Sequence, residues 1–428
     1  MTKATRLFNK NFTLLWQGQL VSLFGVQAYL IAMMFWIKHQ TGSATLVGLV
    51  MAVSQIPAVV LGPISGVFVD RYSRWKIIVG SDLIRGVITI ALASLVFLCP
   101  DEHRIIIVAL FSVGLISSTI AAFFNPAITA SIPELVPSEK LATANSLHAF
   151  SYQASNTVGM GIGGVLFRIF GASTLFFIDG ITYIFSAISE MFIKIPQTFP
   201  DEKTDAKSTL NRLLDDIKEG FLFIWQNKGM RDLFFTATLL NFFLVPGMVL
   251  TPFFVEDYLM ATSDWYGFII GGLGFGNIIG FGIAGGVKVS GPVRSKMNIT
   301  AIILCTVFLS LFGFIRAKEL AVINMFMGGV MGGFFNVNLL TILQQTTPDW
   351  IRGRVFAVLT TISGGLTPVA MGMTGVITDL LNQNVPLVLI AGGALSFFSC
   401  VILTFSRAFR EYMAYEPSPE EVVKEKVG

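Results

Sequence analysis

Long apolar runs constrain this chain more than any other feature of its sequence. A helix that crosses the hydrocarbon core of a bilayer needs about 20 predominantly apolar residues. Runs of that length begin near residues 12, 44, 77, 104, 141, 172, 231, 265, 297, 319, 355 and 385, and polar breaks separate them. The sequence therefore predicts an all-α integral membrane protein with twelve transmembrane helices.

Composition agrees with a membrane protein and argues against several other classes. Of the 428 residues, 54% are hydrophobic and 13% are charged, whereas about a quarter of the residues are charged in a typical soluble domain. The formal net charge of +3 is too small to indicate a nucleic-acid partner. Cys99, Cys305 and Cys400 lie far apart, and no spacing suits zinc or a redox pair. We expect neither a metal site nor a cofactor.

The basic residues indicate how the spans are oriented. Lys and Arg gather at both termini, at the centre of the chain and in alternate breaks. The remaining breaks hold few of them, namely Lys38, Arg104, Arg168, Arg316 and Lys318. Cytoplasmic segments of membrane proteins carry an excess of Lys and Arg. We therefore expect the N-terminus and the C-terminus to lie in the cytoplasm.

One long break, residues 196–230, divides the chain into domains. Its apolar residues recur at helical spacing and share one face, which predicts an amphipathic helix with Ser208 as its N-cap. Such a helix would lie on the inner membrane surface or bind a partner. The predicted domains are a six-helix bundle over 1–195, the linker over 196–230, a second six-helix bundle over 231–410 and a cytoplasmic tail over 411–428.

The two predicted bundles resemble each other in sequence. Three pairs of segments align in chain order: "NKNF" with "NKGM", "GVFVDRYSRWK" with "GVKVSGPVRSK", and "FFNPAITASIPELVP" with "FFNVNLLTILQQTTP". Each pair falls at corresponding cytoplasmic positions of the two halves. The matches indicate a duplicated six-helix unit, which suits alternating access to a site between pseudo-symmetric halves.

Several segments resemble one family of transporters. "GVFVDRYSRWK" is similar to the loop motif of the major facilitator superfamily, Gly-x-x-x-Asp-Arg-x-Gly-Arg-Lys/Arg, and the matching residues are Gly66, Asp70, Arg71, Arg74 and Lys76. Ser73 stands in place of the second glycine, and Trp75 displaces the final base to Lys76. "SDLIRG", "FIDGITYIFSA" and "TTPDWIRGRVFAV" resemble the branch of macrolide-efflux and enterobactin-export proteins. The resemblance covers nearly the whole chain.

This resemblance implies a function. It implies a drug:proton antiporter of the bacterial cytoplasmic membrane that exports a drug-like or siderophore-like small molecule as a monomer. Within the same superfamily, a lysophospholipid transporter is the alternative. A non-transporting ligand sensor is another, although the tail after Arg410 is short. We expect no enzymatic activity, because no catalytic triad or metal cluster stands out.

The loop residues are expected to form a cytoplasmic gate. Asp70 ends the second span, and the family pattern places it opposite the start of the eleventh span, where the helix N-terminus attracts a carboxylate. Arg352, Gly353 and Arg354 form the corresponding motif of the second half. The alternative is a short loop whose basic residues merely follow the positive-inside rule.

Charged residues inside the spans provide the remaining candidates. Asp82 and Arg85 are i, i+3 neighbours, a spacing that favours an ion pair. Asp179 lies well inside the sixth span, where an ionisable residue is by default a functional candidate, so it is the candidate proton carrier. Glu190 is expected nearer the inner surface, and Glu256 is expected at the outer end of the seventh span.

Uncharged polar residues mark candidate positions around a cargo cavity. Gln17 and Gln27 belong to the first span, and Gln153 and Asn156 share one face of the fifth. The glycine-rich stretch that follows matches a dinucleotide-binding pattern by letter, but it lies inside a span and no strand precedes it. We expect its small residues to let helices approach closely.

Overall fold

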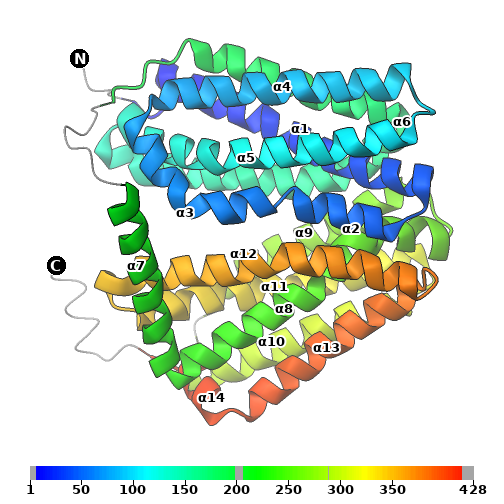
Figure 1. The fold of residues 1–428 in the computed structure, drawn as a ribbon. Helices are drawn as coiled ribbons and strands as arrows, with labels where there is room; N and C mark the ends of the chain where they lie inside the picture. Colours follow the sequence, from blue (N-terminus) through cyan, green and yellow to red (C-terminus); the bar gives the residue numbers. More distant parts are fainter. Residues whose placement is uncertain (1–5, 198–205, 288, 417–428) are drawn as a thin grey trace. The chain divides into compact units, whose positions relative to one another are not determined.

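A computed structural model describes residues 6–197, 206–287 and 289–416, and their regular structure is helical (Figure 1). The first half contains α1 (Lys10–Thr41), α2 (Ala44–Val53), α3 (Ile56–Arg71), α4 (Arg74–Leu98), α5 (His103–Leu135), the 3₁₀ turn η1 (Ser138–Lys140) and α6 (Leu141–Met191). The second contains α7 (Ala206–Gln226), α8 (Lys228–Phe253), the π-helix η2 (Phe254–Tyr258), α9 (Asp264–Gly286), α10 (Gly291–Phe312), α11 (Lys318–Thr346), α12 (Asp349–Leu380), α13 (Val385–Phe405) and α14 (Arg407–Met413).

The helices are long and apolar enough to cross a membrane. Among the described residues, 11 helical segments meet that criterion by length and composition. One of them contains α6, whose 51 residues are interrupted by non-helical backbone at Gly171, with φ 72° and ψ 175°. At 1.5 Å per residue, 51 residues extend about 77 Å, more than twice the thickness of the hydrocarbon core.

Neighbours on α1 show that the chain reverses direction at Gly171. Gly18 lies against Ser186 and Gly25 against Asp179, so α1 runs antiparallel to the second part of α6. Gln27 lies against Gly159, and Ile31 lies against Gly163, so α1 runs parallel to its first part. Glycine adopts positive φ without steric cost. The α6 segment therefore supplies two spans, which brings the described part of the chain to the predicted twelve.

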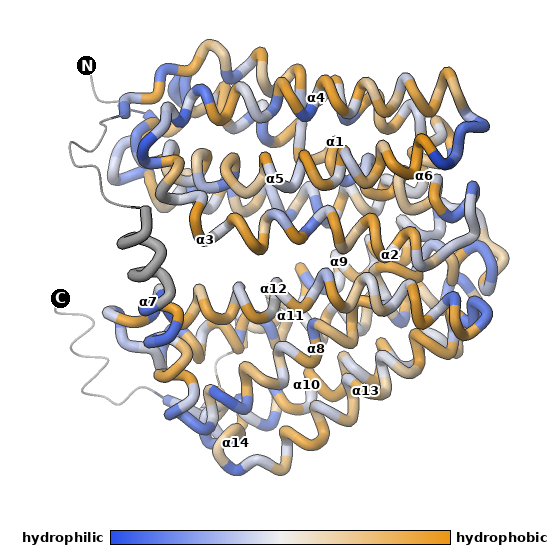
Figure 2. The backbone as a smooth tube through the Cα atoms, in the orientation of Figure 1, coloured by the Kyte–Doolittle hydropathy of each residue, from blue (hydrophilic) through white to orange (hydrophobic). Residues whose placement is uncertain are grey.

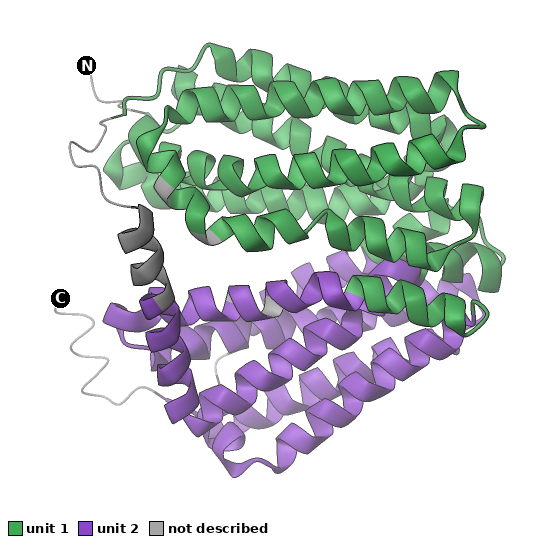
Figure 3. Cartoon of the chain, in the orientation of Figure 1, with its two compact units in different colours: residues 1–212, 251–271, 371–383 green, residues 213–250, 272–370, 384–428 purple. Residues whose placement is uncertain are grey.

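The chain folds into two compact units (Figure 3). Unit 1 comprises residues 1–212, 251–271 and 371–383, and unit 2 comprises residues 213–250, 272–370 and 384–428. In unit 1, α1 and α4 both pack along α6, and α3 packs on α5. In unit 2, α10 packs against α11 and α13. Segments from α8, α9 and α12 thus belong to the first unit, whereas the predicted domain boundaries follow the sequence halves.

Hydropathy along the backbone follows what a bilayer requires. Figure 2 shows hydrophobic residues along most of each long helix and hydrophilic residues gathered at helix ends and connections. Large apolar side chains remain exposed in mid-helix, among them Val87, Val108, Phe235 and Phe398. Side chains of this kind suit contact with lipid tails, which are themselves apolar.

The sequence repeat coincides with matching helix ends. Asn9 caps α1 by accepting a hydrogen bond from the backbone N–H of Phe12 at 3.1 Å. Asn227 precedes α8 and accepts from the N–H of Met230 at 3.0 Å. An asparagine side chain at this position satisfies an N–H that has no partner within the helix. The same capping chemistry therefore opens the first span of each half.

The linker contains the predicted helix, but its start differs from the prediction. The helix α7 begins at Ala206, so Ser208 lies inside it and is not its N-cap. One face packs in unit 2, where Ile224 is buried and Gly220 lies against the backbone of Arg354. Phe221 and Trp225 stack on each other and remain exposed. Ser208 is predicted as the cap from a local sequence pattern. The packing of α7 against α12 is a contact between distant parts of the chain, which such a pattern does not show.

The glycines of the first part of α6 allow a close helix crossing, as predicted. A Cβ atom on Gly267 of α9 would collide with the carbonyl oxygen of Gly161. A Cβ atom on Gly164 would collide in the same way with the carbonyl oxygen of Ser263. These contacts belong to unit 1. Small residues are needed there because the two backbones nearly touch.

Candidate functional site

The loop between α3 and α4 carries the charged motif on its surface. Asp70 pairs with Arg74 at 3.3 Å, and the Asp70 side chain is 62% exposed. Arg74 also donates to the carbonyl oxygen of Ala130 on α5 at 2.9 Å. Arg71 and Lys76 are exposed. Because an exposed ion pair contributes little to stability, Arg74 holds the loop mainly through its bond to α5.

Ser73 takes the place of a motif glycine without distorting the loop. Its backbone is at φ −59° and ψ 111°, and its hydroxyl caps α4 by accepting from the N–H of Lys76. Gly66 has open space where a Cβ would be. Neither position requires the conformational freedom of glycine.

The interior of unit 1 holds an ion pair on α4. Asp82 and Arg85 lie 3.8 Å apart, with side-chain exposures of 0% and 7%. The Arg85 guanidinium stands 4.7 Å from the ring centre of Phe124 and 5.6 Å from that of Tyr183. It also donates to the carbonyl oxygen of Ser117 at 3.4 Å. Aromatic faces attract a guanidinium, so these contacts hold the cation inside the bundle.

A second carboxyl group lies beside this pair. Glu190 is completely buried and accepts a hydrogen bond from Gln19 of α1 at 2.8 Å. Its main-chain oxygen accepts from the Trp75 indole at 3.1 Å. Glu190 is therefore an interior residue that contacts both α1 and α4. It lies one residue before the end of α6, and a position nearer the inner membrane surface stays a prediction.

Asp179 lies deeper on α6 and is 2% exposed. Its Oδ1 atom has no hydrogen-bond partner, and a Cβ atom on Gly25 would approach it to 2.7 Å. Tyr29 and Arg85 are close enough to interact with it electrostatically. The three carboxyl groups and Arg85 together form what we call the buried carboxyl cluster: Asp82, Arg85, Asp179 and Glu190.

The predicted cavity-lining residues have different environments. Gln17 donates to Ser189 at 3.1 Å and links α1 to α6. Gln27 is buried against Gly159, and its Oε1 atom has no partner. Gln153 is exposed and donates to Thr157, one turn further along α6, while Asn156 is half-buried. The structure does not bring these four residues to one place.

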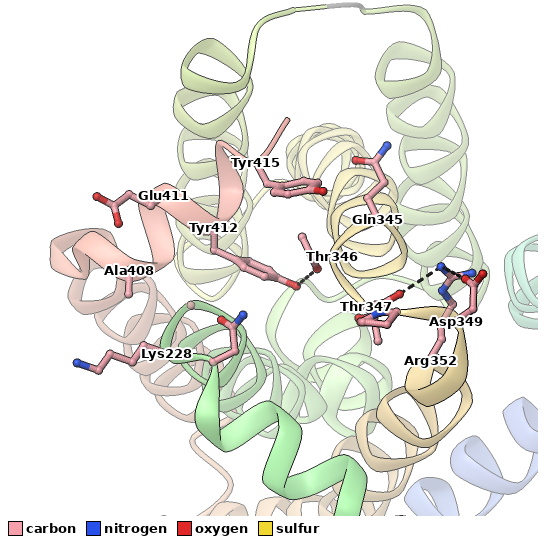
Figure 4. Close-up of a pocket in the computed structure, with 13 residues that line it drawn as sticks. Lys228, Gln345, Thr346, Thr347, Asp349, Arg352, Ala408, Glu411, Tyr412 and Tyr415 are labelled. Carbon is pink, nitrogen blue, oxygen red and sulfur yellow. Dashed lines mark hydrogen bonds and ion pairs between the residues drawn. The ribbon is translucent and has the colours of Figure 1, made fainter. Parts of the chain in front are cut away.

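Unit 2 contains a pocket of about 810 Å³ at the start of α8 and α12 (Figure 4). Its walls include Lys228, Asp349, Arg352, Glu411 and Tyr412. The hydroxyl groups of Tyr412 and Thr346 lie 2.6 Å apart, and a dashed line marks this hydrogen bond in Figure 4. Burial raises the pKa of Tyr412 to about 12. A polar lining with charges of both signs differs from the apolar, aromatic sites that bind drug-sized molecules.

The second-half motif, residues 352–354, makes its ion pairs within unit 2. Arg352 pairs with Asp349 at 2.5 Å and donates to the carbonyl oxygen of Thr347 at 3.2 Å. Arg354 pairs with Asp216 at 2.8 Å and Glu219 at 2.6 Å, both on α7. Gly353 has open space at its Cβ position. The acidic face of the linker helix therefore has a specific partner, which periodicity did not reveal.

A cluster of charges lies at the C-terminal end of α1, and no local sequence pattern indicates it. Lys38 is 8% exposed and binds Glu256 at 2.7 Å and Asp257 at 2.8 Å. His39 contacts Glu256 at 2.9 Å. All these residues belong to unit 1. Glu256 was expected at a helix end, but its partner is 218 positions away in the chain.

Asp379 also contacts residues far away in the chain, at the beginning of α2. Its carboxylate accepts from the N–H groups of Ala44 at 3.1 Å and Thr45 at 2.9 Å, and from the Ser43 hydroxyl at 2.8 Å. A carboxylate is favoured at a helix N-terminus by the unpaired N–H groups and the helix dipole. The end of α12 thereby caps α2.

We expect Asp379→Ala to lower thermal stability by about 1–2 kcal/mol, the usual cost of losing a helix cap. Unfolding of the purified protein in detergent would measure this. Asp101→Asn, a change at an exposed loop acid, is the control. A melting temperature equal to that of the unchanged protein would contradict the capping role.

The described residues form helices long and apolar enough to span a membrane several times, and these helices enclose buried charges, a combination that indicates a polytopic membrane protein with a functional interior. The family model described as "Transmembrane secretion effector" matches residues 2–427. The chain therefore belongs to this family of the major facilitator superfamily.

Named relatives include exporters. The chain is 25% identical to macrolide efflux protein A of Streptococcus pyogenes over 381 residues, covering 87% of this chain and 90% of that protein. It is 30% identical to the Bacillus subtilis protein named "Putative bacilysin exporter BacE" over 311 residues, covering 72% of this chain and 74% of that protein.

Solved structures share the fold. A point mutant of the nucleoside transporter NupG has a TM-score of 0.71 at 15% identity, covering 93% of this chain and all of that one. A bacterial homologue of the iron transporter ferroportin, in an inward-facing state, has a TM-score of 0.68 at 14% identity, covering 94% and 100%. These similarities establish the superfamily fold.

Proposed function

We propose that this protein is a proton-driven exporter of a drug-like or siderophore-like small molecule, which works by alternating access as a monomer with both termini in the cytoplasm. The relatives named for macrolide efflux and bacilysin export support the direction and the class of cargo. They differ in cargo, so we choose a macrolide as the first substrate to test.

The observation that carries proton coupling is the burial of Asp179. An ionised carboxylate without a hydrogen-bonded partner is costly in an apolar bundle, and Asp179 has an Oδ1 atom in that situation. Uptake of a proton removes the charge, and release restores it close to Arg85. A carboxyl group that alternates between these two forms can couple proton movement to a change of conformation.

We expect Asp179→Asn to abolish the protonophore-sensitive part of macrolide efflux. The amide keeps the shape of the side chain but cannot take up and release a proton as a carboxyl group does. Labelled macrolide efflux from pump-deficient cells, with and without a protonophore, would measure this.

Asp179→Glu restores a carboxyl group at that position, and Asp101→Asn tests the same substitution at an exposed loop acid. Membrane abundance is measured for every variant. Efflux in Asp179→Asn that still responds to the protonophore would exclude Asp179 as the carrier. Efflux that ignores the protonophore in the unchanged protein would reject proton coupling.

A further inference from the structure

Glu190 is a buried carboxyl group that the proposed proton carrier leaves unexplained. It is completely buried in α6, and its Oε1 atom accepts one hydrogen bond from Gln19. Its other oxygen, Oε2, has no hydrogen-bond partner. A carboxylate normally accepts several hydrogen bonds or pairs with a cation when it is buried. The environment of Glu190 therefore favours a group that carries a proton on Oε2.

Asp82 offers the complementary acceptor. It is completely buried, and neither of its carboxylate oxygens receives a hydrogen bond. Glu190 and Ser186 are the polar side chains beside it on α6. A proton shared by two neighbouring carboxyl groups supplies a strong O–H···O⁻ hydrogen bond to both.

The charges around the pair support this arrangement. Among the described residues that face it, α1 contributes neutral Gln19, α4 contributes Asp82 and Arg85, and α6 contributes Ser186 and Glu190. Trp75 binds the main chain of Glu190, and α5 contributes Phe124 and the Ser117 carbonyl to Arg85. One guanidinium cannot neutralise both carboxylates, and Asp179 competes for the same cation.

Helix geometry separates this pair from Asp179. The two acids on α6 are eleven residues apart, which is about 16 Å along the axis and close to three complete turns. They therefore lie on one face of the helix, with Tyr183 between them in the chain. The guanidinium of Arg85 stands over the Tyr183 ring. Arg85 is thus placed between two acidic positions.

We propose that Glu190 and Asp82 share one proton and form a second proton-binding site, linked through Arg85 to Asp179. Arg85 can neutralise the charge at one position while a proton neutralises the other. The inference deepens the proposed proton coupling and rests on it for its role in transport. The proton itself can be detected without any transport.

Infrared spectroscopy of the purified full chain in lipid vesicles tests the proposal, because protonated carboxyl groups have a C=O band separate from that of carboxylates. We expect a band of buried, protonated carboxyl groups that Glu190→Gln reduces and Glu139→Gln, at an exposed acid, leaves intact. Asp179→Asn should remove a different component. A band unchanged by Glu190→Gln overturns the proposal.

A second readout covers the case in which Glu190→Gln does not fold. Asp82→Asn keeps Glu190 and removes its partner, so we expect the pH midpoint of the Glu190 component to shift. Trp75 fluorescence should report the same midpoint, and Trp75→Phe should remove that signal. A midpoint unaffected by Asp82→Asn overturns the shared proton. Efflux without proton coupling, alongside an intact Glu190 band, would reject the proposed antiport and leave this site standing.

Discussion

Arg85→Gln is expected to destabilise the protein by about 3–5 kcal/mol, the usual cost of breaking a buried ion pair by removing one partner. Arg85 is 7% exposed and is the cation of the buried carboxyl cluster. Its removal leaves buried acids with no compensating charge. Thermal unfolding in detergent, followed by size-exclusion chromatography, measures the loss.

A double variant separates charge from packing. Asp82→Asn combined with Arg85→Gln removes both members of the pair, and neutral replacement of a buried pair often restores stability. We therefore expect the double variant to be more stable than Arg85→Gln alone. Arg85→Lys keeps the charge but loses the planar stacking over Phe124 and Tyr183, so an intermediate loss is expected.

The opposite result would be informative about the resting state. Arg85→Gln with unchanged stability would mean that the neighbouring carboxyl groups are already neutral and do not need the cation. Equal losses in Arg85→Gln and the double variant would assign the role of Arg85 to packing. Either result contradicts a charge-balancing role.

Run length was sufficient to predict the spans, because the thickness of a bilayer sets the length of a helix. The start of a span predicted near residue 172 lies within one residue of the non-helical backbone at Gly171. The start of α7 was predicted too late in the chain. The predicted N-terminus rests on the preference of serine for the N-cap position, but a serine side chain can also bond to the backbone inside a helix.

Side-chain partners could not be predicted, for a physical reason. A soluble helix shows its buried face by alternation of apolar and polar residues, but a spanning helix is apolar towards lipid as well as towards its neighbours. The sequence pattern of α1 therefore does not show which of its faces is turned towards the other helices. Gln19 was visible as a polar residue in the first span, but its partner Glu190 is 171 positions away.

The polar residues nonetheless carried a usable signal. An ionisable side chain inside a span almost always faces the protein interior, and Asp82, Arg85 and Asp179 all do so. The same rule applied to Glu190 would have included it in the cluster. Its place near the helix end predicts a position nearer the inner membrane surface, and its burial and the bond from the Trp75 indole to its main-chain oxygen place it inside the bundle.

Lys38→Met is expected to weaken the contact between α1 and η2 by about 2–5 kcal/mol, the usual cost of truncating one partner of a buried charge pair. Lys38 binds both Glu256 and Asp257 and lies 5.5 Å from the ring centre of Phe253. Methionine keeps most of the apolar stem but removes the ammonium group from both carboxylates, while Glu256 keeps its contact with His39. The neutral double variant Lys38→Met with Glu256→Gln should recover part of the loss.

In the proposed alternating access, the outer end of the protein is either closed or open. The contact of Lys38 with Glu256 and Asp257 belongs to the closed form, so its loss shifts the population towards the open form. A shift of about 1.4 kcal/mol changes that equilibrium about tenfold.

Ser263→Cys, at a residue 6% exposed in unit 1, reports opening after the three native cysteines are replaced by serine. We expect an impermeant maleimide to label it at least about tenfold faster with Lys38→Met. Lys194→Met, a lysine change at an exposed position elsewhere in unit 1, should leave labelling unchanged. Equal labelling rates in the Lys38→Met and unchanged backgrounds would show that the charges hold α1 in place without controlling access.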